Sequence, residues 1–90
     1  MKKYQIIVKG RVQGVCFRDF TRRTANSLNI LGIVKNLING DVKVVAVANE
    51  DDMKKFISKL RIGPSMARVN DLEITNLDST REYTDFKIVF

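Results

Sequence analysis

The sequence predicts an α+β sandwich in which two helices cover one face of an antiparallel sheet. Two segments carry apolar residues at helical spacing, and the segments between them have the alternation or the β-branched content of strands. Together they give the order β-α-β-β-α-β plus a terminal strand, which is the order of the ferredoxin-like sandwich. Because that fold hosts many functions, the function has to be inferred from particular residues.

The first half of the chain predicts a strand, a tight loop, a helix and a hairpin. Residues 4–9 alternate as in a strand, and a glycine-bearing loop leads from them into the helix. The apolar positions of this helix are Phe17, Phe20, Thr24, Leu28 and Leu31. Strands are expected over residues 32–37 and 41–48, and the pair Asn39-Gly40 between them indicates a hairpin turn.

The second half predicts one more helix and two more strands. The polar and acidic residues 49–52 suit the positive end of a helix, and Gly63-Pro64 ends that helix. Its apolar stripe consists of Met53, Phe56, Ile57 and Leu60. Strands then fit residues 67–76 and 84–90, and alternate apolar residues of the last strand share one face.

Length and composition predict one folded domain over residues 1–90. No signal-type apolar run is present, and no stretch approaches the roughly 18 apolar residues of a membrane span, so we expect a cytoplasmic protein without a membrane partner. A single cysteine excludes an intrachain disulfide, and the absence of histidine disfavours a zinc site or a histidine base. We therefore expect no cofactor and no metal, and the small size favours a monomer.

The net charge of +6 favours an anionic partner, which is either a nucleic acid or a small anion. The basic residues are scattered along the chain rather than gathered in one stretch. Aromatic residues make up only 8% of the chain, and they do not form the pattern with which single-strand RNA binders stack bases. A small anion is the favoured interpretation, with no nucleic-acid partner.

Residues 10–18 are the strongest indication of where such an anion binds. They place a glycine-bearing turn and Arg18 at the expected start of the first helix. Several backbone N–H groups lack partners at a helix start, and the macrodipole is positive there, so an anion is stabilised. The planar guanidinium of Arg18 matches two phosphate oxygens at once. The segment therefore predicts a phosphate-binding loop.

Three motifs give the chain a resemblance to a known family. They are G-x-V-Q-G-V-x-F-R at residues 10–18, G-x-V-x-N at residues 32–36 and G-P-x-x-A-x-V at residues 63–69. With these motifs in this order, the chain resembles the acylphosphatases, small enzymes that hydrolyse the mixed anhydride of a carboxylic acid and phosphoric acid. The resemblance runs along the full length, and it implies an acyl phosphate substrate.

The resemblance also implies the site residues. Asn36 would hold the attacking water, and Arg18 would bind the substrate phosphate together with backbone amides of the loop. The loop residues are Gln13, Gly14, Val15, Cys16, Phe17 and Arg18. We expect direct in-line attack of the water on phosphorus, with no metal and no covalent enzyme intermediate. A structural role in the turn is the alternative for Asn36, because asparagines cluster before hairpins.

Cys16 departs from the family pattern, in which many members have glycine between the residues equivalent to Val15 and Phe17. One interpretation is a small, half-buried hydrophobic side chain packed behind the loop. The other is a reactive thiol, activated by the helix start and by Arg18, whose modification would block the pocket. A milder departure is Ile33, at a position where the family often has an aromatic residue.

Two other functions stay open at this stage. The chain could be a non-catalytic module that binds acyl or carbamoyl phosphate, as a domain of a larger protein. It could also be a ferredoxin-like nucleic-acid-binding domain, which would require aromatic residues on the exposed face of the sheet. Turnover of an acyl phosphate distinguishes the enzyme from both.

Overall fold

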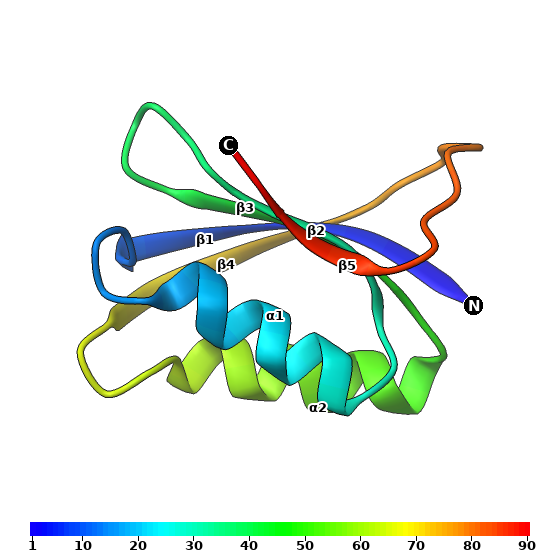
Figure 1. The fold of residues 1–90 in the computed structure, drawn as a ribbon, viewed down its shortest axis with the longest axis horizontal. Coiled ribbons are helices and arrows are strands. Elements are labelled where there is room, and N and C mark those ends of the chain that lie inside the picture. Colours follow the sequence, from blue (N-terminus) through cyan, green and yellow to red (C-terminus); the bar gives the residue numbers. More distant parts are fainter.

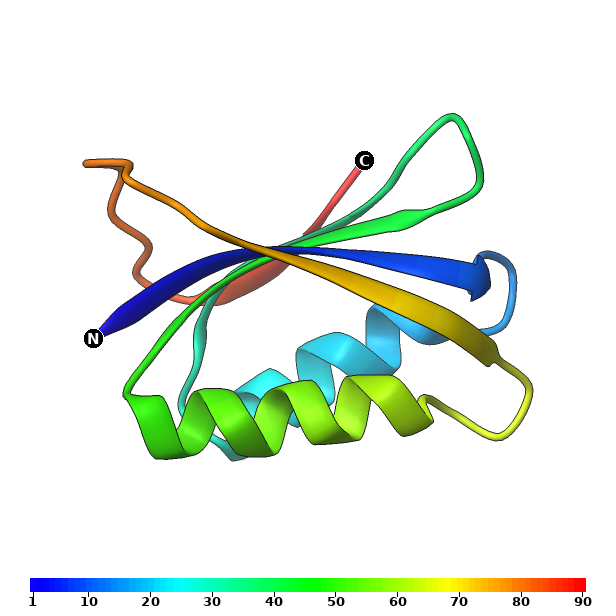
Figure 2. The same cartoon turned by 180° about the vertical axis from the view of Figure 1, so that it is seen from behind.

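The structure is a two-layer sandwich in which a five-stranded sheet carries both helices on one face (Figure 1). The computed structural model describes residues 1–90. Its elements are β1 Lys2–Arg11, α1 Phe17–Ser27, β2 Leu31–Asn36, β3 Val42–Ala48, α2 Glu50–Ile62, β4 Arg68–Asn76 and β5 Phe86–Val89. Seen from behind, the twisted sheet again lies on one side and the helices on the other (Figure 2). The predicted α+β sandwich is confirmed, together with the order of its elements.

The terminal strand is the exception to the antiparallel sheet that the sequence predicts. The strand order is β4-β1-β3-β2-β5, and the first three neighbouring pairs are antiparallel, but β5 pairs with β2 in parallel. The chain leaves β4 at the end of the sheet where β1 and β2 begin (Figure 1). Residues 77–85 cross that same end to the opposite edge, so β5 starts beside the start of β2 and runs in its direction.

The hairpin between β2 and β3 has a longer loop than the expected Asn39-Gly40 pair. The Gly40 N–H donates to the Leu37 carbonyl at 3.2 Å, and the Leu37 N–H donates to the Asp41 carbonyl at 2.8 Å. These bonds enclose Ile38, Asn39 and Gly40, and Gly40 has φ 99°. This is the pattern of a three-residue hairpin loop, in which a turn is followed by a glycine at positive φ.

Leu31 lies in β2, so the prediction that it continues the apolar face of the first helix is wrong. The helix ends at Ser27, because Asn29 adopts a left-handed φ of 56° and the Ile30 N–H folds back to the Ala25 carbonyl at 2.9 Å. An asparagine in this conformation is a common helix stop. The chain leaves α1 one turn earlier than the apolar spacing indicates.

Helix α2 begins and ends where the sequence predicts. The Asn49 side-chain oxygen accepts a hydrogen bond from the Asp52 N–H at 2.8 Å, which satisfies one of the free donors of the first turn. Gly63 follows the last turn with φ 68°. The predicted stripe faces the sheet, with Met53, Phe56 and Leu60 buried and Ile57 partly buried. Neither helix of the structure has the length and apolar character needed to cross a membrane.

The core fills the space between the helices and the sheet. Ile6 and Val8 of β1 and Val34 of β2 are fully buried on the helix side, as the two-residue alternation of strands requires. Phe56 of α2 meets Phe86 of β5 edge to face, with ring centroids 6.2 Å apart. This contact holds β5 against the helix layer. The adjacent β2 and β5 also pack against α1, whose N-terminal end carries the candidate site.

Truncating the core face of α2 tests this packing. Leu60→Ala should lower the free energy of unfolding by about 2–5 kcal/mol, because the removed atoms are fully buried and leave a cavity. Ile62→Ala is the matched control, since Ile62 lies in the same helix but is 78% exposed, and its change should stay within about 0.5 kcal/mol. Urea unfolding followed by circular dichroism measures both. Equal losses in the two variants would contradict the assigned core.

Candidate functional site

The loop between β1 and α1 has the backbone pattern of an anion-binding nest. Gly14 has φ 73° and Cys16 has φ 62°, whereas Gln13, Val15 and Phe17 between and beside them do not have positive φ. Left-handed residues that alternate with others turn successive N–H groups toward one concave side, where an anion can sit. The local structure therefore agrees with the phosphate-binding loop that the sequence predicts.

The N-terminal end of α1 has unused hydrogen-bond donors. Cys16 is the cap residue, and its carbonyl accepts the first helical bond, from the Phe20 N–H at 3.0 Å. No side chain caps the helix at this end. The N–H groups of the first turn have no acceptor within a helix, so they are available to a bound anion together with the positive end of the helix dipole.

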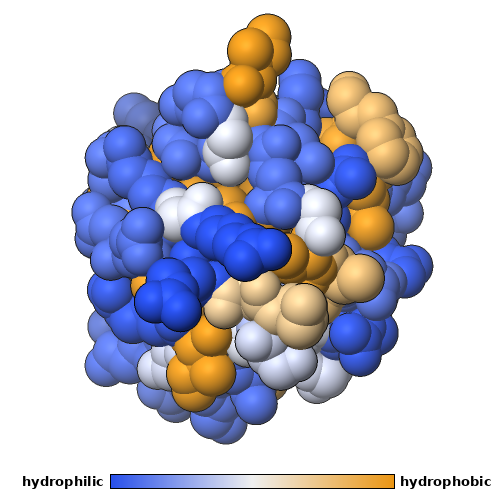
Figure 3. Space-filling view, turned by 90° about the vertical axis from the view of Figure 1, so that its left-hand side faces the viewer, coloured by the Kyte–Doolittle hydropathy of each residue, from blue (hydrophilic) through white to orange (hydrophobic).

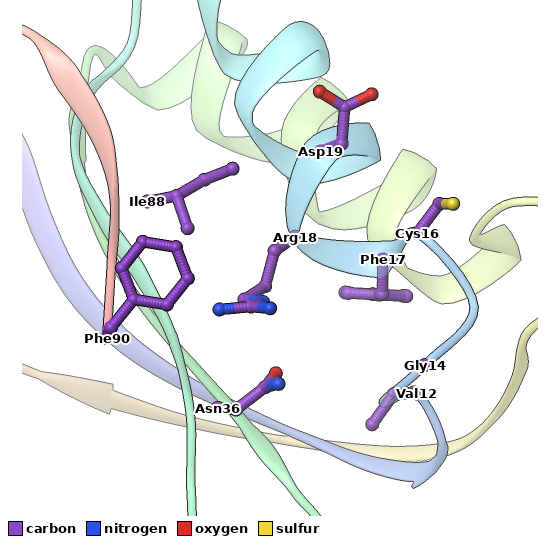
Figure 4. Close-up of a pocket in the computed structure, with 9 residues that line it drawn as sticks. All are labelled: Val12, Gly14, Cys16, Phe17, Arg18, Asp19, Asn36, Ile88 and Phe90. Atoms are coloured by element: carbon purple, nitrogen blue, oxygen red, sulfur yellow. The ribbon is translucent and has the colours of Figure 1, made fainter.

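Cys16 is exposed, so its interpretation as a half-buried hydrophobic side chain behind the loop is wrong. The left-handed φ directs its side chain outward, and in Figure 4 the sulfur points away from Arg18. The thiol thus leaves the space in front of Arg18 clear while its backbone stays part of the loop. The reactivity of this thiol stays a prediction.

Arg18 and Asn36 meet in one pocket of about 340 Å³ (Figure 4). Arg18 comes from the first turn of α1, and Asn36 is the last residue of β2. The lining residues are Val12, Gly14, Cys16, Phe17, Arg18, Asp19, Asn36, Ile88 and Phe90. The side-chain oxygen of Asn36 is buried and has no hydrogen-bond partner in the protein, so it serves no turn of the hairpin. Arg18 forms no ion pair with any carboxylate of the structure.

Two predicted loop residues do not line this pocket with their side chains. Val15 is buried in the core. The Gln13 side-chain amide donates to the Leu37 carbonyl at 2.7 Å and to the Asp41 carbonyl at 2.8 Å. These two carbonyls flank the three-residue hairpin loop that follows β2 and Asn36. Gln13 therefore ties the loop that precedes Arg18 to the hairpin that carries Asn36, a role its sequence motif does not show.

Asp19 places a carboxylate beside the candidate anion site, and two arginines hold this carboxylate. Arg22 donates to one Asp19 oxygen at 2.7 Å and Arg23 to the other at 2.9 Å. The hydrogen bonds from Arg22 and then Arg23 lower the pKa of Asp19, so the carboxyl keeps its charge to a lower pH than an ordinary aspartate. Figure 4 shows it turned away from Arg18. Its charge is compensated locally and does not compete with a ligand for the Arg18 guanidinium.

Sequence reasoning missed four of the lining residues, which are Val12, Asp19, Ile88 and Phe90. Of these four, only Asp19 has interactions that could have been predicted from the sequence. Arginines three and four positions after it indicate ion pairs along a helix. Ile88 and Phe90 reach the pocket because β5 pairs with β2. That parallel pairing joins segments that are far apart in the sequence, so no pattern of neighbouring residues predicts it.

The surface around the site is mostly hydrophilic. Figure 3 views the end of the molecule where the loop after β1 and the hairpin loop lie, and it shows hydrophilic groups with smaller, separated apolar areas. No cluster of three or more His, Cys, Asp and Glu side chains is placed to hold a metal ion. Among the residues that line the pocket, Arg18 and Asn36 are the two with nitrogen-bearing side chains that can donate to a ligand.

Comparisons with known proteins agree on one family. Residues 4–88 match the acylphosphatase family model. An acylphosphatase of Dehalococcoides mccartyi strain CBDB1 is 49% identical over 83 residues, which is 91% of each chain. The crystal structure of the Bacillus subtilis acylphosphatase has a TM-score of 0.95 at 36% identity and covers 100% of both chains. Full-length HypF in its phosphate- and nucleotide-bound form also matches, with a TM-score of 0.86 at 30% identity over 99% of this chain and 12% of HypF.

The link made by Gln13 can be tested by removing its donors. Gln13→Met keeps the length of the side chain but loses both hydrogen bonds, each worth about 0.5–1.5 kcal/mol. We expect lower stability and a fall in turnover of about tenfold or more, because Asn36 and the loop would no longer be held together. Gln5→Met is the matched control, since the Gln5 side chain forms no hydrogen bond in the structure. Steady-state kinetics and urea unfolding measure the two variants, and identical kinetics would contradict the role of Gln13.

Proposed function

The chain belongs to the acylphosphatase family, and on this premise we propose how its pocket hydrolyses acyl phosphates. Arg18 and the amides of residues 13–18 bind the phosphate group, and Asn36 holds the water that attacks phosphorus. The observation that carries this proposal is the meeting of Arg18 and Asn36, from separate elements, in one pocket at the N-terminal end of α1.

Phosphate binding combines three sources of positive potential. The alternating backbone around Gly14 and Cys16 supplies N–H groups, and the start of α1 adds its dipole. Arg18 adds a full charge and a planar set of donors that matches two phosphate oxygens. Because Arg18 is paired with no carboxylate, the substrate does not have to displace a competing anion. These features favour a doubly charged phosphate group over a carboxylate ligand.

Asn36 suits the positioning of the nucleophile. Its buried side-chain oxygen has no protein partner and can accept a hydrogen bond from water. The NH₂ group of the same amide can donate to a phosphate oxygen, so one neutral side chain aligns water and phosphorus. Such alignment removes much of the entropic barrier of a reaction between two molecules.

The chemical step needs little else from the protein. A bond forms between the water oxygen and phosphorus as the bond between phosphorus and the acyl oxygen breaks, and its electron pair leaves with the carboxylate. One water proton passes to a phosphate oxygen, and the products are carboxylate and inorganic phosphate. A carboxylate is a good leaving group, so no protein acid has to protonate it, and no metal or cofactor is required. Catalysis then consists of positioning and of stabilising the spread negative charge.

The family and the pocket also indicate the substrate class, the oligomeric state and the cellular compartment. The substrate is a small-molecule acyl phosphate. We infer that residues 1–90 act as one monomeric domain, because a single core supports a pocket that is complete within one chain. A pocket of about 340 Å³ suits a small molecule and favours a small anion over a nucleic acid. The free, exposed thiol of Cys16 supports a reducing compartment such as the cytoplasm.

Removing the two side chains should have different effects. Arg18→Ala should lower kcat/KM for benzoyl phosphate by about 10²- to 10³-fold or more and weaken inhibition by inorganic phosphate, since a donor and a charge are lost. Asn36→Ala should lower kcat with much less effect on phosphate affinity, because the position of the water matters mainly in the transition state. Hydrolysis is measured with a chelator present, at equal fold content by circular dichroism.

Arg81→Ala is the control for these variants, because it removes the same charge from the segment between β4 and β5, beside the start of β1 at the opposite end of the sheet, and should leave the kinetics unchanged. Equal loss of phosphate binding in Arg18→Ala and Asn36→Ala would contradict the separate roles. A native chain that binds phosphate without turnover would indicate the non-catalytic module instead.

The rate should change little between about pH 5.5 and 8, because the chain has no histidine and the proposed chemistry uses no side chain as acid or base. Asp19 lines the pocket, but the hydrogen bonds from Arg22 and Arg23 lower its pKa, so it is ionised throughout this window and protonates only below it. The profile of kcat and kcat/KM for benzoyl phosphate at constant ionic strength checks this. A bell centred at about pH 7 would rule out a mechanism without acid–base groups.

A further inference from the structure

Phe90 is an exposed aromatic residue that contacts the phosphate-binding arginine. Its ring centroid lies 4.9 Å from the Arg18 guanidinium carbon, and Figure 4 shows the ring beside the guanidinium. The residue is 94% exposed and takes no part in the hydrophobic core. The ring therefore adds little to the packing of the core, and its aromatic face contacts Arg18.

The sheet register brings Phe90 to this place. Val34 lies beside Ile88 and Lys35 beside Val89 in the parallel pair of β2 and β5. One further step along this register puts Phe90 next to Asn36. Because side chains two positions apart share a face, Phe90 and Asn36 lie on the same side of the sheet as the buried Val34. That side faces α1, so the ring meets Arg18 at the start of the helix.

An aromatic face is well suited to hold an arginine that has to bind an anion. The ring attracts the cation through its quadrupole, and it has no oxygen that would accept hydrogen bonds from the guanidinium in place of a phosphate. A carboxylate partner would occupy those donors and compete with phosphate. Arg18 has no such partner in the structure. Without the ring, the long side chain of Arg18 would lose its rotational freedom only when the substrate binds, at a cost in binding free energy.

We propose that Phe90 is a positioning residue, whose ring contacts Arg18 and holds the guanidinium in the orientation that receives the phosphate. The proposal rests on the role of Arg18 in the proposed function. The aromatic ring pre-orders Arg18 before substrate binds, so the contribution appears in the affinity for phosphate.

Kinetics of Phe90→Leu and Phe90→Tyr test the proposal. Phe90→Leu should raise KM for benzoyl phosphate and the inhibition constant of inorganic phosphate by about two- to fivefold, the range of an exposed cation–π contact. Its kcat should change less, because Arg18 holds the phosphate in both the ground state and the transition state. Phe90→Tyr keeps the ring and should restore both constants. A merely structural role would instead lower kcat through loss of folded enzyme and leave the inhibition constant unchanged.

A matched control and a spectroscopic signal complete the test. Tyr83→Leu removes another ring that stacks on an arginine, Arg81, at 5.2 Å, and it should leave phosphate inhibition unchanged. In ¹H–¹⁵N spectra of the free enzyme, the Arg18 side-chain N–H signal should move downfield in Phe90→Leu, because protons above a ring face are shielded.

The outcomes separate this proposal from the one on which it rests. An unshifted Arg18 signal, or an unchanged inhibition constant in Phe90→Leu, would overturn the role of Phe90 while Arg18→Ala still loses phosphate affinity. Native phosphate affinity in Arg18→Ala would overturn the role of Arg18, and that of Phe90 with it.

Discussion

The site depends on the left-handed backbone at Gly14 and Cys16. These two residues reverse the chain between the end of β1 and the start of α1, and they leave the first turn of the helix without a side-chain cap. The same turn sets the direction in which Arg18 leaves the helix. A conventional capped entry into α1 would satisfy donors that an anion is meant to use. The proposed anion binding and the geometry of the fold therefore depend on the same local conformation.

Buried neighbours fix the residues of the pocket. Phe17 precedes Arg18 and is buried, and Val34 lies two positions before Asn36 on the same face and is fully buried. Both polar side chains thus extend from backbone that the core already holds. The Gln13 side chain then connects the two parts of the site directly. A site that is ordered in this way loses little conformational freedom when substrate binds.

The charged side chains are arranged so that the electrostatic potential in the pocket stays positive. Arg22 and Arg23 compensate Asp19, the carboxylate side chain that lines it, whereas Arg18 is left without an anionic partner. HypF contains a part with the same fold, which covers only 12% of its chain. The fold therefore serves in proteins of very different length, and the function of each has to be read from its site residues.

The sequence by itself determined the features that neighbouring residues specify. The order of helices and strands, the cap at Asn49, the hairpin after β2 and the approximate location of Arg18 and Asn36 all follow from periodicity, turn chemistry and motifs. Tertiary structure alone decided that β5 runs parallel to β2, that Phe90 meets Arg18 and that the Gln13 side chain bonds the hairpin. These features depend on where the chain crosses the sheet and on which distant segments then meet, and no local pattern encodes such contacts.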